Sequence, residues 1–487
     1  MHLAGVREYS LKYLTTKRIM KKLKSIYLLL LSVLVIGAFA SCAGSTDDDD
    51  GKPDVFKGEA YFTVQVAVAG DTQATSRAAG PQGGEDGDGR ETAFENEYKV
   101  NNVCVFLYSS TTGISDGDAM VEQAFYFKKP TEKPGNTKYD KVYTFEKKQC
   151  LPIVVSKAYH VLVVANAGDI TNTYLNKNLS ELRDAYLQAF DPTSKYFIMT
   201  SEKDATTKLT SAGGNATGDG TEANPLTVNV DIERLAARID IDPGDGKYFD
   251  SPTTPGTGTY AFDVKDVSNN LVGGFVLESI LPYNKLTSGE FCIKRVGDKA
   301  GTSLTYLGNE NTVSETDKTA TNYVIDPWTS GKNTGSTPSG LTYNVRKLND
   351  ASWPSATKYL PVRNVLDPTS SSFFVLDYAM ENTTFDNSEE YATGLVFKGK
   401  YYELSDWDTT NKQPKAGAAG TDKYYTYTIR HSDPTGAGPK TAPMYYGIVR
   451  NNIYRIKIEG VVDEKKGMVL TIAVKKWAKY THAETSM

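Results

Sequence analysis

The sequence predicts an all-β fold with two successive β-sandwich domains. Three observations lead to this prediction. Short segments with alternating apolar and polar residues recur along the chain. Glycine-, proline-, serine- and threonine-rich stretches separate them, and the main helix candidate is short, within residues 172–190. The chain also has 487 residues, which is more than one ordinary domain holds.

The first 41 residues have the pattern of an export signal. Three lysines between residues 21 and 24 precede an apolar run over 26–40. This run suits the apolar core of a secretion signal and is short for a membrane span. It ends in Ala40-Ser41-Cys42-Ala43, which resembles the bacterial lipobox, whose cysteine is lipidated and becomes the mature N-terminus. We therefore expect a signal peptide over 1–41, with Met20 as the candidate true start, and lipidation of Cys42.

An acidic segment follows the lipidation cysteine. Residues 47–50 are consecutive aspartates, and like charges at this density keep a chain extended. Residues 42–58 are therefore expected to form a lipidated tether. The segment also resembles the acidic tag that Bacteroidetes-type lipoproteins carry for transfer to the cell surface, which favours surface exposure.

The first predicted strand covers residues 59–69. Its apolar face, at period two, consists of Phe62, Val64, Val66 and Val68. The pattern stops at residue 70, and residues 70–92 are rich in glycine, aspartate and alanine. This composition predicts an exposed linker, in which Arg77 and Arg90 offer protease sites.

Further strands are predicted in both halves of the chain. In the first half they cover 99–108, 124–128, 141–145 and 158–164, and the short helix that follows has one apolar side made of Leu179, Leu182, Tyr186 and Phe190. In the second half they cover 226–232, 260–264, 271–280, 373–378, 395–404, 423–430, 448–458 and 468–474. Long loops are expected between them. We place the N-terminal sandwich at 78–225 and the C-terminal sandwich at 226–487.

The sequence gives no support for an enzyme, a cofactor or a metal site. No zinc-binding CxxC or HExxH spacing, phosphate loop, nucleophile elbow or dinucleotide fingerprint occurs in a credible context. The formal charge of −5 and the absence of a basic patch argue against nucleic-acid binding. The aromatic pairs Tyr401-Tyr402 and Tyr445-Tyr446 can stack on sugars, although cross-strand packing is the commoner role of such pairs in a β protein.

Three cysteines remain after Cys42. They are Cys104, Cys150 and Cys292, and an odd number cannot all pair within one chain. A Cys104–Cys150 bridge fits an oxidising compartment, and Cys104 also fits a strand as a small core residue. The sequence leaves both alternatives open.

A mechanism follows from a detachable first strand, a cleavable arginine after it and an apolar strand at the C-terminus. Cleavage at Arg77–Ala78 would release the strand at 59–69 and expose an apolar groove with unpaired backbone groups, which accepts a strand from another chain. The segment 468–474 offers a matching face made of Met468, Leu470, Ile472 and Val474. Burying four such side chains is worth roughly 6–12 kcal/mol before ordering costs. Head-to-tail use of this contact produces an open fibre.

The sequence resembles a known family, the Bacteroidales-type fimbrillins, which are the major structural subunits of surface fimbriae. The resemblance is carried by the lipobox and by the segments 159–167, 233–239, 446–456 and 469–477, the last two being YGIVRNNIYRI and VLTIAVKKW. It implies two transthyretin-like β-sandwiches and export as a lipoprotein. It further implies removal of the first strand by an Arg-specific protease and polymerisation by strand exchange from a neighbour's C-terminus.

Carried over to this chain, the resemblance makes residues 59–77 a propeptide that is cut between Arg77 and Ala78. Arg90 is the second candidate, because it lies in the same linker. The donor strand is either 468–474 or the tail from Trp477 to Met487, with the former strand staying in its own domain.

The resulting hypothesis is a stalk subunit of a bacterial fimbria that supports adhesion. Its expected partners are other copies of itself, accessory fimbrial subunits, an Arg-specific protease, a host or bacterial surface receptor and, before processing, the outer membrane through the lipid. The alternatives are an anchor or tip subunit of the same system and a surface glycan-binding lipoprotein.

Overall fold

The structure is a computed structural model. It describes residues 59–69, 90–109, 119–134, 139–145, 149–152, 158–183, 186–188, 196–201, 205–208, 216–286, 288–290, 295–297, 303–307, 312–314, 350–365, 372–382, 389–430, 446–462 and 467–478. Nearly all of them belong to one compact unit, formed by Ala60–Gln149 and Ile153–Met487. Of the described residues, Glu59 and Cys150–Pro152 belong to the other unit.

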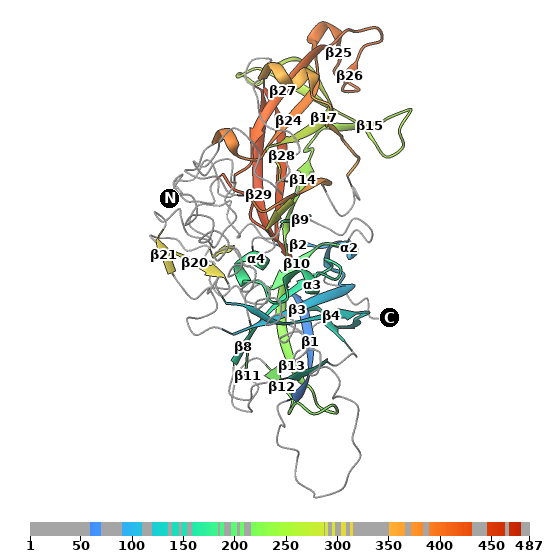
Figure 1. The fold of residues 1–487 in the computed structure, drawn as a ribbon. Coiled ribbons are helices and arrows are strands. Elements are labelled where there is room, and N and C mark those ends of the chain that lie inside the picture. The colour runs from blue at the N-terminus through green and yellow to red at the C-terminus, as the bar shows by residue number, and fades with distance from the viewer. Residues whose placement is uncertain are drawn as a thin grey trace, which may run out of the picture. The chain divides into compact units, whose positions relative to one another are not determined.

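The first sheet follows the path β4-β3-β8-β10-β13-β1-β6-β5 (Figure 1). The bounds along this path are β4 Val121–Lys128, β3 Asn102–Tyr108, β8 Ala158–Ala165, β10 Met199–Ser201, β13 Leu226–Arg234, β1 Glu59–Ala69, β6 Tyr139–Thr144 and β5 Thr131–Pro134. Two short strands extend it, β11 (Ala205–Lys208) beside β8 and β12 (Ala216–Thr217) beside β13.

The second sheet follows the path β2-β29-β28-β16-β17-β24-β27. The bounds are β2 Arg90–Thr92, β29 Met468–Ala478, β28 Asn452–Val462, β16 Gly258–Lys265, β17 Leu271–Tyr283, β24 Gly394–Glu403 and β27 Thr421–Thr428. Four further strands pair with members of this path: β14 Ala236–Asp242, β15 Lys247–Asp250, β22 Leu360–Pro361 and β23 Phe374–Met380. Its core is built from alternating strand residues, among them Ile239, Phe262, Phe397 and Ile456.

The remaining elements are short. The strands are β7 Gln149–Pro152, β9 Tyr186–Gln188, β18 Ser288–Glu290, β19 Arg295–Gly297, β20 Ser303–Leu307, β21 Thr312–Ser314, β25 Trp407–Asp408 and β26 Gln413–Pro414. The helices are α2 Glu95–Tyr98, α3 Thr171–Tyr174 and α4 Leu179–Arg183, with 3₁₀ turns η1 Asp350–Ser355, η3 Glu389–Tyr391 and η4 Leu404–Asp406. Strands therefore dominate, and the predicted all-β fold class is confirmed.

One stretch of chain runs from the first sheet directly into the second. β13 ends at Arg234 and β14 begins at Ala236, with only Leu235 between them. Leu235 is fully buried, its backbone N–H donates to the carbonyl of Ile198 at 3.1 Å, and its carbonyl accepts from the N–H of Glu381 at 3.4 Å. The change of sheet thus falls at Leu235, whereas the domain boundary expected at residue 226 stays a prediction.

The helix expected over 172–190 is wrong in its extent. Two short helices, α3 and α4, flank Asn176, whose φ of +63° takes the backbone out of the right-handed helical region. Leu179 and Leu182 are fully buried as expected, but Tyr186 begins strand β9. Phe190 lies outside the described residues. In the described part of the chain, no helix has the length and apolar character that crossing a membrane requires.

Candidate strand-exchange site

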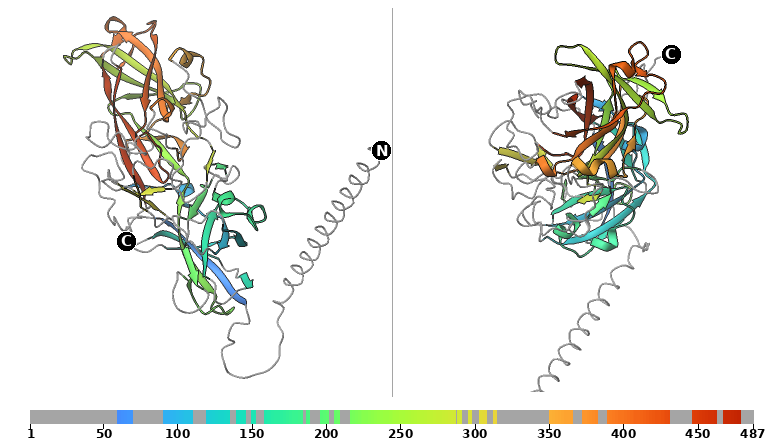
Figure 2. Two further views of the ribbon diagram at one scale, coloured as in Figure 1. Left: turned by 60° about the vertical axis from the view of Figure 1, so that its left-hand side comes forward. Right: turned by 90° about the horizontal axis from the view of Figure 1, so that it is seen from above.

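Strand β1 lies inside the first sheet, with a partner on each side (Figures 1 and 2). It pairs in parallel with β13, from Phe62 opposite Leu226 to Val68 opposite Ile232. On its other side it pairs antiparallel with β6, from Gln65 opposite Thr144 onward. Because β1 is an interior strand, its removal would leave the backbone groups of both β13 and β6 unpaired.

The side chains predicted to form the apolar face of β1 are buried in the core. Phe62, Val64, Val66 and Val68 have exposed fractions of 0–1%. The ring of Phe62 packs against two aromatic rings of β4, with centroid distances of 6.1 Å to Phe125 and 6.5 Å to Phe127. Loss of this face would cost roughly 6–12 kcal/mol of apolar burial. A replacement strand must therefore bring apolar side chains at period two.

The opposite face of β1 is less apolar. Thr63 and Ala67 are buried, Gln65 is half-buried, and the hydroxyl of Thr63 donates to the carbonyl of Phe145 at 3.3 Å. The two faces of β1 therefore make different demands on a replacement strand: four apolar groups on one side and small or polar groups on the other.

The segment predicted as the donor strand lies in β29, in the second sheet of its own chain. β29 pairs antiparallel with β28 over nearly its whole length, from Met468 opposite Val461 to Lys476 opposite Asn452. Met468 and Leu470 pack against the core of that sheet. Ile472, Val474 and Trp477 follow in the same strand. The other alternative is the tail from Trp477 to Met487. Its first two residues are the last of β29, and residues 479–487 lie outside the described residues.

The processing residues can be located only in part. Cys42, Arg77 and Ala78 lie outside the described residues. Arg90, the second cleavage candidate, is the first residue of β2 and is paired with Lys476 of β29. A protease binds its substrate as an extended chain with free backbone groups, so this pairing disfavours Arg90 as a site.

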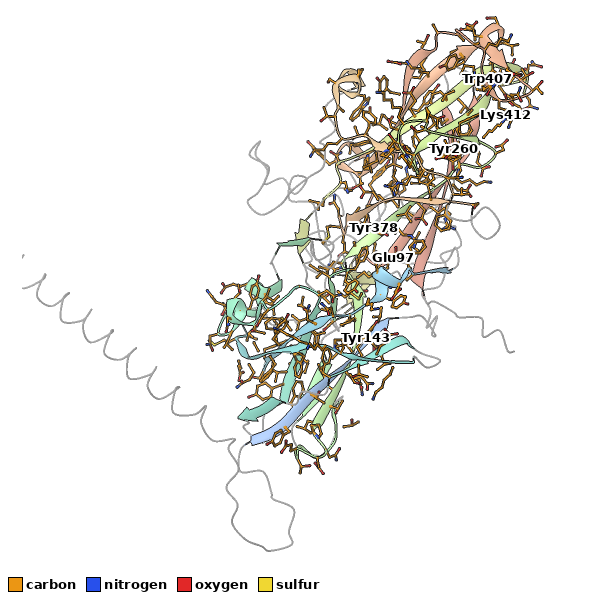
Figure 3. All side chains as sticks on the ribbon, turned by 90° about the vertical axis from the view of Figure 1, so that its right-hand side faces the viewer. Glu97, Tyr143, Tyr260, Tyr378, Trp407 and Lys412 are labelled. Atoms are coloured by element: carbon orange, nitrogen blue, oxygen red, sulfur yellow. The ribbon has the colours of Figure 1, made fainter. Side chains whose placement is uncertain are left out.

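A buried cluster of charges, which the sequence analysis did not predict, joins α2 to the second sheet (Figure 3). The carboxylate of Glu97, on α2, accepts hydrogen bonds from Nη1 of Arg238 at 3.1 Å and from the hydroxyl of Tyr378 at 2.8 Å. Arg238 also donates to Asp240, from Nε at 2.9 Å and from Nη2 at 3.1 Å. Nη2 of Arg455 donates to the same carboxylate at 2.9 Å.

Three of the four charged side chains in this cluster are fully removed from water, and the fourth, Arg455, is 11% exposed. The side chains of Glu97, Arg238 and Asp240 have no exposed area. Burial raises the pKa of Asp240, and the neighbouring Arg238 and Arg455 oppose that effect. Burial also raises the pKa of Tyr378, as does Glu97 beside it, so this hydroxyl stays protonated and acts as a hydrogen-bond donor to Glu97. Burial by itself would lower the pKa of Arg238, but the two carboxylates raise it, and the guanidinium stays charged.

A sequence signal for this cluster existed. Arg234 continues the period-two apolar series of 226–232, and an arginine on the apolar face of a strand needs buried acceptors. Arg238 alternates with the core residues Ala237, Ile239 and Ile241, so the pattern alone would place it on the other face. The partner on α2 could not be identified in the same way, because Glu97 lies more than a hundred residues earlier in a segment without a strand pattern.

Cys104 is a free thiol in the core, as the small-residue alternative expected. It is fully buried in β3, and its Sγ donates to the carbonyl of Gly168 at 3.1 Å. Burial raises the pKa of this thiol to about 12. Within the described ranges, no group of three or more metal-ligating side chains is arranged to hold an ion.

Together the fold and this strand arrangement define an all-β protein whose first strand is an interior member of its sheet. Comparison with known families extends this result. The model of the major fimbrial subunit protein (FimA) matches residues 60–234, and that of the major fimbrial subunit protein type IV, fimbrillin, C-terminal, matches residues 419–482. These matches confirm the resemblance to the Bacteroidales-type fimbrillins.

Among solved structures, the chain is similar to a fimbrilin (FimA) from Porphyromonas gingivalis, with 16% identity, coverage of 86% of this chain and 99% of that one, and a TM-score of 0.37. It is also similar to a fimbrial assembly protein from Parabacteroides distasonis, with 12% identity, coverage of 85% and 96%, and a TM-score of 0.35. The fimbrial anchor protein Mfa2 from P. gingivalis gives 9% identity, coverage of 87% and 100%, and a TM-score of 0.29. A search of curated proteins found no match. The family assignment rests on the two family models and not on these distant likenesses.

Proposed function

We propose that this fimbrial subunit forms the stalk of a bacterial surface fimbria and polymerises head-to-tail by donor-strand exchange. The observation that supports this most strongly is the position of β1. It is an interior strand with a fully apolar face, and it precedes a linker that contains Arg77. An interior strand at the start of a chain can be excised by one cut, and the groove that it leaves requires another strand.

Two donors stay open in this proposal. The segment 468–474 of β29 brings the four apolar side chains that the groove requires, whereas the tail after Ala478 leaves β29 in its own sheet but has only Tyr480, Ala483 and Met487 as apolar residues. Transfer of β29 would break the ladder with β28 and remove Met468 and Leu470 from the core of the second sheet. It would therefore open one groove in order to fill another, with little net gain in buried apolar area. Use of the tail would leave the ladder between β28 and β29 intact, but it would meet only part of the groove's need for four apolar side chains at period two.

The earlier steps of the proposal concern export and processing. The chain is exported as a lipoprotein through Cys42 and held at the outer membrane by its lipid. An Arg-specific protease then cuts after Arg77, which releases residues 42–77 together with the lipid and β1. The processed subunit joins other copies of itself and accessory subunits, and the fimbria contacts a receptor on a host or bacterial surface. Its role is structural and needs no catalytic site.

The glycan-binding alternative loses part of its basis. Tyr401 and Tyr402, one of the aromatic pairs considered for sugar stacking, are 6% and 9% exposed and pack within the second sheet. Side chains buried to this degree offer little surface for a sugar ring.

The test uses the exported chain, residues 43–487. Limited trypsin digestion is followed by mass spectrometry of the new N-termini, and assembly is followed by electron microscopy. The stalk proposal expects a cut after Arg77 and then head-to-tail fibres. If the tail is the donor, deletion of residues 479–487 abolishes the fibres without changing the cut, and fibres that persist identify 468–474 as the donor. Deletion of Met487 alone serves as the control. A processed chain that stays monomeric would favour an anchor, a tip subunit or a glycan-binding protein.

A further inference from the structure

The segment that follows the cleavage linker touches the second sheet at two points. Its first contact is β2, whose residues Arg90, Glu91 and Thr92 pair in parallel with Lys476, Trp477 and Ala478. These are the last three residues of β29. At this end β29 therefore has β28 on one edge and β2 on the other.

The second contact is α2, which begins three residues after β2. Ala93 is 1% exposed, and Glu97 enters the buried charge cluster on β14. The backbone carbonyl of Glu97 also accepts a hydrogen bond from Nε of Arg234 at 2.6 Å, and its carboxylate accepts one from the N–H of Phe94 at 2.7 Å. The ring of Phe94 lies 4.9 Å from the guanidinium of Arg238.

These contacts hold α2 in place, which its own helical hydrogen bonds could not do. A helix of four residues has no stability of its own in water. Withdrawing one partner of a buried ion pair, in contrast, is strongly unfavourable, because the other charge is left buried without compensation. Glu97 thus holds the short β2 against β29 by holding the residues that follow it.

We propose that residues 90–98 are a clamp that retains β29 in its own sheet during maturation. This role rests on the proposed function, but the clamp itself can be measured in the unprocessed monomer. A cut after Arg77 leaves the clamp whole. A cut after Arg90 separates the first residue of β2, so the site of processing also determines how firmly β29 is held.

Hydrogen exchange measured by mass spectrometry on residues 43–487 tests the clamp. Glu97→Ala removes the anchor, and Glu95→Ala is its matched control, because Glu95 lies on the same helix and is 71% exposed in its pair with Lys99. The clamp predicts exchange about tenfold or more faster in peptides covering 468–478 for Glu97→Ala. Peptides covering 271–283, from β17, should keep their protection in both variants.

A second pair of variants distinguishes local release of β29 from unfolding of the whole protein. The double variant Glu91→Pro/Thr92→Pro removes the backbone donors of β2 without altering the charge cluster. Its control is Glu95→Pro, at the first helical position, where proline is tolerated. Faster exchange of 468–478 in the double variant alone supports the clamp. Unchanged exchange there, with β17 still protected, overturns it. No processing or assembly is involved, so either result is independent of whether fibres form.

Discussion

Because Phe62 lies in β1, we expect Phe62→Ala to change the stability of the precursor but not that of the processed subunit. Phe62 is fully buried and its ring packs against Phe125 and Phe127. Replacing a buried phenylalanine by alanine costs about 3–5 kcal/mol, since apolar burial is lost and a cavity remains. Phe62→Ala should therefore destabilise the first sheet of the precursor by about that amount.

In the subunit cut after Arg77, the same substitution should have no effect on stability. The proposal has β1 leave with residues 42–77, so the altered side chain is no longer present. Pulse proteolysis across a urea gradient measures both forms, before and after processing and assembly. Gln65→Ala is the matched control, because Gln65 is only half-buried on the other face of β1 and its loss should cost less than about 1 kcal/mol.

Two results would refute this reasoning. An equal loss of stability in the precursor and in the processed material would mean that β1 stays in the groove after the cut. A loss below about 1 kcal/mol in the precursor would mean that Phe62 does not contribute to the core as its burial indicates.

Three further predictions follow from other parts of the chain. Arg77→Ala should prevent cleavage and leave a monomer by native gel, and fibres that still form would identify another site. Arg238→Ala, which leaves Glu97 buried without its guanidinium, should cost about 3–5 kcal/mol in urea unfolding, with the exposed Arg363→Ala as a neutral control. Cys104 should resist alkylation at pH 8, because burial raises its pKa to about 12. The unfolded thiol ionises near 9.0, so the contribution of the buried thiol to the free energy of unfolding is complete below pH 9 and is lost as the pH rises towards 12. Cys104→Ala should therefore flatten the dependence of stability on pH between 9 and 12. Alkylation of the Cys104 peptide in the folded protein at pH 8 would contradict this prediction.

The strands were the predictable part of this fold. The pattern at 59–69 gives β1 with the same bounds, and the segment 158–164 gives β8 to within one residue. Period-two alternation is a local property that burial on one face imposes on the sequence, and it can therefore be seen without the fold. The helix was less predictable, because the left-handed Asn176 that interrupts it does not change the apolar spacing around it.

The contacts of the N-terminal segment with the second sheet could not be predicted from the sequence. β2 is three residues long and lies at the end of a glycine- and aspartate-rich linker, so it has no strand pattern of its own. Glu97 occurs among polar residues and looks like an ordinary surface acid. Its burial depends on Arg238, which is distant in the sequence, and only the folded chain brings the two together.

The topology also links the groove of β1 to the C-terminal strand through a single continuous stretch of chain. β13 is the parallel partner of β1, it passes through Leu235 into β14, and β14 pairs in parallel with β28, whose other partner is β29. In a fibre joined as proposed, tension on a donor strand in the groove would reach the next donor through these ladders. The buried charge cluster lies on β14, at the middle of this path. In the proposed stalk, this cluster would resist separation of α2 from the second sheet, because withdrawal of Glu97 would leave buried charge without compensation.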